Sequence, residues 1–229
     1  MFNKKGSSLF EQEKKKKESR ESGTPWTLKL AYNESKVPII FLESLEDAPT
    51  EYIHKLFFGT RDSHVTVCLG EGCPLCQAYA SGEKKAKPTA CCFFSVLDMR
   101  PYTKKDGTEV KFDRKILAAT SKTYETIVGA LNNDDESQGE LKFAKFLAAR
   151  GPEGQPSPPI TGDIYSFKSH VDLDKLGIPK DQQVPFTLDE VASTIITDAE
   201  EIAKLAARFG VKAPEEKESS ENVSYDLDD

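Results

Sequence analysis

Three cysteines lie close together in the sequence, at positions 68, 73 and 76. Cys73 and Cys76 flank a Pro-Leu pair, and two cysteines with this spacing can bind one metal ion from a single turn of the chain. In a reducing compartment, thiols gathered in this way indicate metal ligands before they indicate disulfides. A structural zinc ion takes four nitrogen or sulfur ligands. The pattern therefore predicts a structural zinc site with Cys68, Cys73 and Cys76 as three of its ligands.

The fourth ligand must come from elsewhere in the chain. The candidates are His54, His64, Cys91 and Cys92. If the segment around Arg61 is the turn of a hairpin, His54 faces Cys68 directly, and opposed Cβ atoms lie about 4.5–5.5 Å apart. His64 is on the same strand as Cys68, and at about 3.3 Å per residue it would lie too far away. The two remaining cysteines lie in an apolar strand, where one faces the core as a small hydrophobe. We therefore predict His54.

Two other uses of the cysteines are disfavoured. A redox Cys-x-x-Cys pair normally begins a helix in a βαβ unit, and the surrounding pattern is not of that kind. A catalytic zinc keeps one position open for water, whereas the thiols and imidazole here can close the site. The sequence also contains no Gly-rich phosphate loop and no His-Glu-x-x-His motif. We therefore expect a protein that is not an enzyme.

The elements that must position these ligands are mostly short strands. Alternation and apolar runs predict strands over 26–31, 37–42, 52–58, 64–69, 90–99, 110–118 and 160–169. Pro38 favours an edge position for its strand, because proline cannot donate to a neighbour. The Lys105–Thr108 segment contains Asp-Gly and predicts a hairpin turn. Helical patterns cover 121–131, 140–150 and 187–210. Many short strands followed by helices predict a mainly β chain with added helices (α+β), built as a small barrel or curled sheet.

Charge is distributed unevenly along the chain. Residues 1–131 carry 21 Lys and Arg against 17 Asp and Glu, a net charge of +4, whereas the whole chain has −7. Residues 132–212 have a net charge of −5 and residues 213–229 have −6. This gradient indicates a polyanionic partner, or ordinary charge scatter with a solvated acidic tail. No apolar run approaches the roughly 20 residues of a membrane span, and no signal peptide follows the N-terminus, so we expect a cytoplasmic protein with no membrane contact.

Several of these motifs together resemble a known family. A hairpin histidine, a cysteine further along the chain, Cys-Pro-Leu-Cys and a Phe-rich strand that ends in Val-Leu-Asp-Met-Arg occur in this order. This arrangement resembles the zinc-containing single-stranded DNA-binding proteins of tailed bacteriophages. The resemblance covers residues 24–131 at the level of motifs, and residues 132–212 match no family that we can name.

The resemblance implies an organisation and a function. It implies a basic flexible arm (1–23), an OB-like core (24–212) with a zinc subdomain at about 52–92 and helical additions, and an acidic tail (213–229). It implies sequence-independent binding of single-stranded DNA in phage replication, recombination and repair, in the cytoplasm of a host cell. It also implies that the tail recruits replication and recombination proteins, and that the arm promotes self-association. The alternative is a zinc-stapled replisome or transcription adaptor that binds proteins rather than DNA.

A protein that coats single strands needs cations for the phosphates and aromatic faces on which bases stack. Aromatic and basic residues are interleaved in the front half of this chain. Of these, Tyr102 and Phe112 lie beside polar residues and are expected to be exposed. The DNA-binding residues predicted on this basis are Trp26, Lys29, Tyr32, Arg61, Arg100, Tyr102, Lys104, Lys105, Lys111, Phe112, Arg114 and Lys115.

Overall fold

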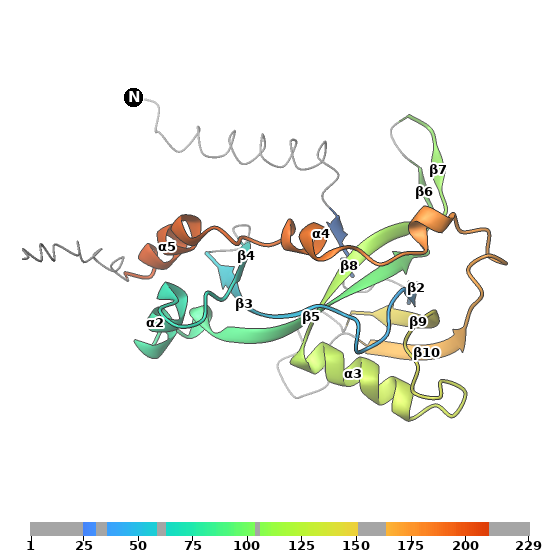
Figure 1. Ribbon diagram of the computed structural model, residues 1–229, viewed down its shortest axis with the longest axis horizontal. Coiled ribbons are helices and arrows are strands. Elements are labelled where there is room, and N and C mark those ends of the chain that lie inside the picture. Colours follow the sequence, from blue (N-terminus) through green and yellow to red (C-terminus); the bar gives the residue numbers. More distant parts are fainter. Residues whose placement is uncertain (1–24, 31–35, 59–62, 104–105, 151–163, 211–229) are drawn as a thin grey trace, which may run out of the picture.

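A computed structural model describes residues 25–30, 36–58, 63–103, 106–150 and 164–210 of the chain. One large, mostly antiparallel sheet carries short helices on its faces and at one end (Figure 1). Its strands are β1 (Trp26–Thr27), β2 (Val37–Phe41), β3 (Thr50–Phe57), β4 (Ser63–Val67), β5 (Pro88–Asp98), β8 (Asp113–Thr120), β9 (Ala144–Ala149) and β10 (Ile164–His170). A separate small hairpin consists of β6 (Tyr102–Thr103) and β7 (Glu109–Val110).

The helices are short. They are α2 (Pro74–Ala80), α3 (Ser121–Asn132), α4 (Leu188–Ala192) and α5 (Ala199–Ala207), with 3₁₀ turns η1 (Lys84–Ala86) and η2 (Lys180–Gln182). The mixture of a large sheet and few helices confirms the mainly β class predicted from the sequence. Within the described ranges, none of the helices combines the length and the apolar character needed to cross a membrane.

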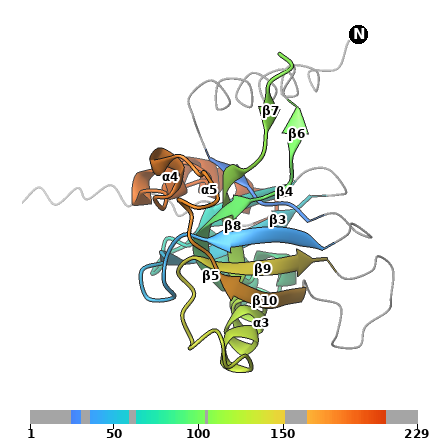
Figure 2. The same ribbon diagram turned by 90° about the vertical axis from the view of Figure 1, so that its right-hand side faces the viewer.

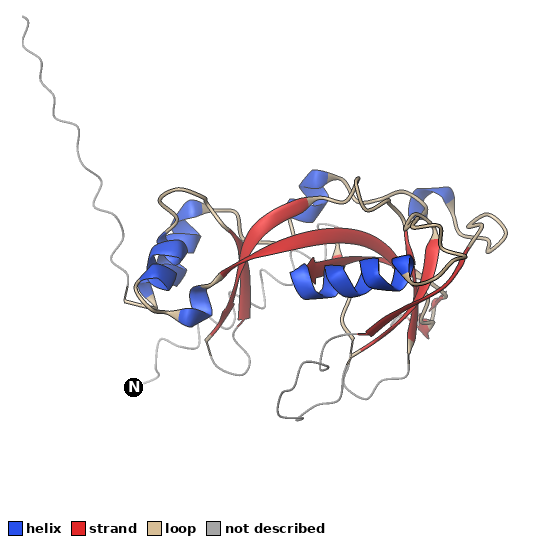
Figure 3. Ribbon diagram, turned by 90° about the horizontal axis from the view of Figure 1, so that it is seen from below, coloured by secondary structure: helices blue, strands red, loops and turns tan. Residues whose placement is uncertain are grey.

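Strand β5 organises the whole molecule. Its side chains alternate between two buried faces: Cys92, Phe94 and Val96 pack in the same cluster as Ile127 of α3, whereas Cys91 and Phe93 pack with Val191 of α4. A strand that is covered on both faces needs apolar residues at every position, which explains its continuous apolar run. Figure 3 shows this long, curved strand beside β8, spanning the distance between the two ends of the molecule.

The two ends of β5 hold different parts of the protein. On one edge, β8 pairs along the strand from Cys91 to Asp98. On the other edge, β3 pairs with the first half of β5, and β2 pairs with the second half. The first half therefore carries the β3–β4 hairpin, and the second half carries the β2–β9–β10 layer above α3 (Figure 2). The described pairings follow an open path from β1 to β10, so a closed OB-type barrel stays a prediction.

The predicted edge position of Pro38 is wrong. Strand β2 lies between β5 and β9 in the sheet. The carbonyl of Pro38 accepts a hydrogen bond from the backbone N–H of Met99, the residue that follows the end of β5. Because the nitrogen and carbonyl of a strand residue point to the same side, the missing N–H of Pro38 falls where the β2–β5 ladder ends. A central strand can accept a proline at that position.

The helix predicted over 140–150 is wrong, and this segment contains β9. Alanine, leucine and lysine favoured a helix, yet the segment pairs with both β2 and β10. Ala144, Phe146 and Ala148 are fully buried on one face, which is a period of two. Phe143 has a positive φ of 61° directly before the strand, a conformation that interrupts a helix. Tertiary pairing has therefore overridden helix propensity.

The predicted helix over 187–210 is in fact two helices. Thr187 and Glu190 form a capping box at the start of α4, and the Asp198 side chain caps α5. Between them, Ile196 forms a bridge with Thr66, and its backbone exchanges hydrogen bonds with Val65 and Val67 of β4. This pairing fixes the segment against the β3–β4 hairpin and explains the break. The helix predicted over 121–131 is confirmed as α3, and the strand predicted over 160–169 is confirmed as β10 within its described part.

Candidate metal centre

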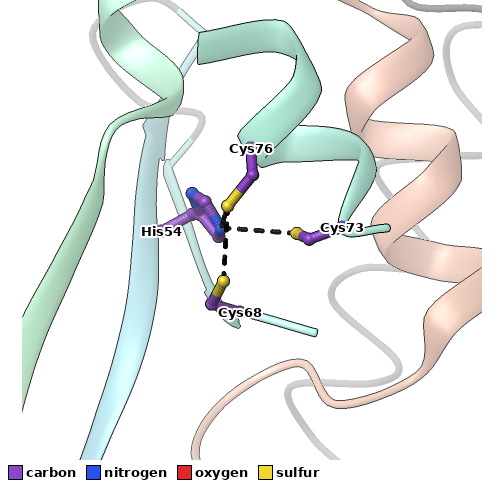
Figure 4. A group of neighbouring side chains, drawn as sticks. All are labelled: His54, Cys68, Cys73 and Cys76. Atoms are coloured by element: carbon purple, nitrogen blue, oxygen red, sulfur yellow. Dashed lines mark hydrogen bonds between the residues drawn. The ribbon is translucent and has the colours of Figure 1, made fainter. Parts of the chain in front are cut away.

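Four side chains converge at the end of the β3–β4 hairpin. His54 lies on β3, Cys68 follows β4, Cys73 is the N-cap of α2, and Cys76 lies in its first turn. One ligand atom from each residue lies within 4.8 Å of all the others. Figure 4 shows the three sulfurs around the imidazole. The four predicted ligands are therefore close enough to hold one metal ion.

Three of the distances between ligand atoms match those of a small tetrahedral site. The Sγ atoms of Cys68 and Cys76 are 3.4 Å apart. The Nε2 atom of His54 lies 3.5 Å from the Sγ of Cys73 and 3.7 Å from that of Cys76. With metal–ligand bonds of about 2.0–2.3 Å, ligand atoms around a tetrahedral zinc ion are separated by roughly 3.5–3.8 Å. The site is consistent with zinc, and four ligands leave no position open for a substrate.

The turn before α2 brings Cys73 and Cys76 close to Cys68. The backbone N–H of Cys73 bonds to the carbonyl of Gly70, and both Gly70 and Gly72 have positive φ angles, of 74° and 80°. Glycine adopts these angles without steric cost, so the chain can reverse tightly between Cys68 and Cys73. Pro74 then starts the helix. One turn of helix brings Cys76 back toward the thiol of Cys73.

The second nitrogen of His54 fixes the direction of the ring. Its Nδ1 atom lies 2.7 Å from the carbonyl oxygen of Ala86, and His54 is fully buried. A carbonyl can only accept, so Nδ1 carries the proton and Nε2 presents its lone pair to the thiols. Burial lowers the pKa of His54, and the hydrogen bond to Ala86 only partly offsets this. The imidazole is thus neutral, as a metal ligand must be.

The predicted register of the hairpin is wrong by two residues. His54 pairs with Thr66, and the backbone N–H of Cys68 bonds to the carbonyl of Tyr52. The observed pairs place the centre of the hairpin one residue before Arg61. His54 nevertheless reaches the cysteines, because Cys68 lies beyond the end of β4 and the chain then turns back over β3.

The thiols resist ionising together. Burial raises the pKa of Cys76 to about 12, and the neighbouring Cys68 and Cys73 add to the rise. Burial also opposes ionisation of Cys73, but hydrogen bonds from the backbone of Cys76, Leu69 and Leu75 outweigh it and lower its pKa. Without a cation, the site therefore accommodates one thiolate more readily than three. A bound divalent cation would reverse this, because it stabilises every thiolate that it binds.

Helix α5 covers the candidate metal centre. Ile202, Leu205 and Ala206 of α5 pack in one buried cluster with Leu56 and Leu75. Phe58 stacks on Phe209 with ring centroids 4.9 Å apart, and Arg208 lies over the same Phe58 ring. The metal-bearing hairpin therefore owes part of its core to residues that are far away in the sequence.

The other candidate ligands lie elsewhere. The ring of His64 packs edge-on against that of Phe58, with the two ring centroids 6.0 Å apart. Cys91 and Cys92 are both buried, on opposite faces of β5, and burial raises the pKa of Cys91 to about 11. Both cysteines act as small core residues, whereas the sequence predicted this for one of them.

Comparison with protein-family models finds no match, and comparison with curated proteins and with solved structures finds no significant match.

A groove runs beside the metal-bearing hairpin. Its volume is about 680 Å³, and it is lined by residues 27–30, by parts of β3, β4, β5, β8 and β10, by the residues Arg100 and Arg150 that follow β5 and β9, and by Thr194 and Ile195. Among the described residues that line it, none is acidic. Its basic side chains are Lys29, Lys55, Arg100 and Arg150. The described lining of the groove is thus basic.

The groove shares a strand with the metal centre. Lys55 and Phe57 face the groove from β3, whereas His54 and Leu56 face the metal side. Phe57 is 56% exposed. Period-two alternation from His54 could have identified Lys55 and Phe57, which the sequence-based set of DNA-binding residues lacks. No local pattern could have placed Arg150 here.

The predicted DNA-binding residues have different locations. Lys29 and Arg100 line the groove. Trp26, beside the lining residue Thr27, is 56% exposed, and Tyr102 on β6 is 41% exposed. Lys111 is exposed at the surface. Tyr32, Arg61, Lys104 and Lys105 lie outside the described residues.

The last three residues of that set contact the protein itself. Phe112 is half-buried against the cluster of Ile40, Leu97 and Leu173, so the prediction that it is exposed is wrong. The Arg114 guanidinium lies 4.0 Å from the centre of the Phe186 ring. The Lys115 ammonium lies 2.7 Å from a carboxylate oxygen of Asp98.

Proposed function

We propose that this chain binds single-stranded DNA without sequence preference, and that a structural zinc ion fixes one wall of the binding groove. The observation that carries the proposal is the groove with four basic side chains and no acidic one among its described lining residues. A backbone-tracking cationic groove with aromatic side chains is the general requirement for such binding. The resemblance of the motifs to phage single-strand binders supports the same conclusion.

The groove also offers surfaces for bases. Phe57 stands exposed at its edge, and Trp26 is exposed at the start of the segment that lines it. A base stacked on an aromatic ring contributes about 1–3 kcal/mol regardless of its identity. Phosphates contact the cations while bases contact the rings, so the site distinguishes single strands from duplexes, in which the bases are already stacked.

Zinc is the metal that best fits the four ligands. Three thiolates and one imidazole form a closed set that is typical of structural zinc. The ion would link β3 to the turn before α2, and it would hold the strand that presents Lys55 and Phe57 to the groove. Its contribution is structural, because no ligand position is left for reaction chemistry.

Equilibrium binding tests the proposal. Fluorescence anisotropy with a labelled oligothymidylate, compared with a duplex of equal length over a salt series, should show tight single-strand binding that weakens with salt. Four phosphate contacts give a slope of about −3 for log K against log salt. No binding to single strands would contradict the proposal and favour the adaptor function. Lys55→Ala should reduce the slope by about 0.7, whereas Lys84→Ala, an exposed lysine on η1 outside the groove lining, should leave it unchanged.

The aromatic contribution needs its own comparison. Phe57→Ala should weaken binding by about 1–3 kcal/mol and leave the salt slope unchanged, because a stacking contact carries no charge. Tyr79→Ala removes a similarly exposed ring from α2, outside the groove lining, and should have no effect. Equal effects of the two variants would exclude Phe57 as a stacking platform.

The proposal extends to the ends of the chain and to the barrel. It includes an OB-type arrangement of the sheet, self-association through residues 1–23, and recruitment of replication and recombination proteins by residues 213–229. Both terminal segments lie outside the described residues. A chain that ends at Lys212 should bind oligothymidylate more tightly than the full chain, because the truncation removes a tail with a net charge of −6.

A further inference from the structure

The most deeply buried carboxylate near the groove belongs to Asp98. This last residue of β5 is only 1% exposed. Arg100 approaches it with Nε at 2.9 Å and 3.1 Å from the two carboxylate oxygens, and with Nη2 at 2.5 Å from Oδ2. Lys115 lies 2.7 Å from Oδ2. Burial alone would raise the pKa of Asp98, but the hydrogen bonds from Arg100 and Lys115 lower it, so it is ionised.

Asp98 lies behind the groove and is not part of its lining. Arg100 does line the groove. Its Nη2 also donates to the backbone carbonyl of Lys29 at 3.3 Å, and Lys29 is another lining residue. One guanidinium therefore connects the buried carboxylate to the segment around Lys29, which also lines the groove. Lys115 also lies 3.8 Å from a carboxylate oxygen of Asp113, so it is shared between two carboxylates, whereas Arg100 is held by Asp98.

We propose that Asp98 is a positioning residue for the groove: it holds the Arg100 guanidinium in a fixed orientation, from which Arg100 contacts a phosphate and supports the Lys29 segment. The proposal rests on the proposed function. It also gives a role to the Asp-Met-Arg end of the motif that the sequence analysis singled out. A forked pair of this kind fixes a planar cation far better than a single contact does.

Simple electrostatics predicts the opposite effect of removing Asp98. Asp98→Asn deletes a negative charge beside a phosphate groove, so the field alone should tighten binding. If Asp98 acts by positioning, the same substitution leaves the Arg100 side chain free to adopt several rotamers. DNA binding must then order this side chain at a cost in conformational entropy, so affinity falls. The sign of the change therefore separates the two roles.

The experiment is a double-mutant cycle read by anisotropy with labelled oligothymidylate. Asp98→Asn should bind about fivefold more weakly than the wild type, a typical coupling for groups in one network. In an Arg100→Ala background, Asp98→Asn should have little further effect. Glu109→Gln removes the same charge from an exposed position on β7 outside the groove lining, and it should bind as the wild type does. Thermal unfolding and metal content establish that each variant is folded.

Each possible result of this experiment either supports or overturns the positioning role of Asp98. Unchanged or tighter binding by Asp98→Asn, or an equal loss in both backgrounds, overturns the positioning role. If Asp98→Asn does not fold, Arg100→Lys replaces it, since Arg100 is partly exposed and lysine keeps the charge but lacks the fork. If Arg100→Lys loses nearly as much affinity as Arg100→Ala, the proposal is supported. If Arg100→Lys binds as tightly as the wild type, the proposal is overturned. Failure of the wild-type chain to bind single strands would instead refute the proposed function, and this role with it.

Discussion

The imidazole of His54 and the carbonyl of Ala86 are 2.7 Å apart, and this one contact orients the metal centre. Since Nδ1 must donate to the carbonyl, Nε2 is left facing Cys73 and Cys76. Ala86 is fully buried on η1, immediately before β5 begins. The hydrogen bond between His54 and Ala86 therefore connects the β3–β4 hairpin to the segment that leads into β5, the strand that organises the rest of the sheet.

The first prediction concerns the metal itself. The chain should contain one zinc ion, and Cys73→Ser should lose it and lower the free energy of unfolding by about 3 kcal/mol or more, because metal binding contributes directly to folding. Elemental analysis and chemical denaturation measure the two quantities. Cys91→Ala, which removes a buried thiol outside the site, should keep a full complement of zinc. Loss of zinc from this control would contradict the ligand assignment.

The second prediction concerns α5, which packs against the β3–β4 hairpin and α2 around the candidate metal centre. Ile202→Ala should destabilise the protein by about 2–4 kcal/mol, since Ile202 is fully buried between α5 and the hairpin. Zinc should also transfer faster to a chelator, because the cluster packs directly around Cys73. The matched variant Leu188→Ala removes a side chain that is 70% exposed on α4, and we expect a change within about 0.5 kcal/mol. Equal stability of the two variants would show that α5 does not stabilise the β3–β4 hairpin and α2.

The metal ligands could be predicted because their signals are local. The Cys-x-x-Cys pair, the glycines before it and the hairpin pattern all lie within a short stretch of chain. Only the register of the hairpin was wrong, since it depends on a turn whose exact length no residue pattern in this segment specifies. His54 still lies close enough to the three cysteines to share a metal ion with them, because alternation places it on the same face of β3 as Leu56, whichever residue of β4 it pairs with.

The groove could not be predicted in the same way. Its wall combines Lys29, Lys55 and Arg150, which come from three strands or their ends and meet only in the folded sheet. Strand β9 was predicted as a helix for the same reason, because its conformation is set by pairing with β2 and β10. Residues such as Phe112 and Arg114, with local patterns typical of exposed binding residues, are instead held by segments distant in sequence.

The third prediction concerns Arg114. Its guanidinium covers Phe186, donates to the carbonyl of Val184 at 2.9 Å and lies 3.5 Å from Glu190. These contacts fasten the segment before α4 to the sheet, so Arg114→Ala should lower stability by about 1–2 kcal/mol. Its affinity for oligothymidylate should fall less than that of Lys55→Ala. Lys111→Ala, which removes an exposed basic side chain three residues earlier, should leave stability unchanged. If Arg114→Ala lost more free energy of binding to oligothymidylate than free energy of unfolding, Arg114 would belong to the binding site.

The fourth prediction concerns Glu43, whose carboxylate accepts a hydrogen bond from the backbone N–H of Ser95. Burial raises its pKa from 4.5 to about 7, the bond from Ser95 opposes the rise, and Asp47 adds to it. Because the folded state disfavours the charged form, stability from this group is complete below pH 4.5 and is lost as pH rises through about 7. The difference corresponds to at most roughly 3 kcal/mol.

Glu43→Gln tests this directly, because glutamine is neutral at every pH and its carbonyl can still accept from Ser95. At pH 5, urea unfolding should show the variant to be more stable than the wild type by less than about 1 kcal/mol, because Glu43 is still mostly protonated in the folded state. At pH 8 the variant should be more stable by about 1–3 kcal/mol. The matched change Glu46→Gln removes a neighbouring carboxylate that is exposed, and it should shift stability little at either pH. A gain for Glu43→Gln that is the same at pH 5 and pH 8 would mean that the charge of Glu43 is not its cause.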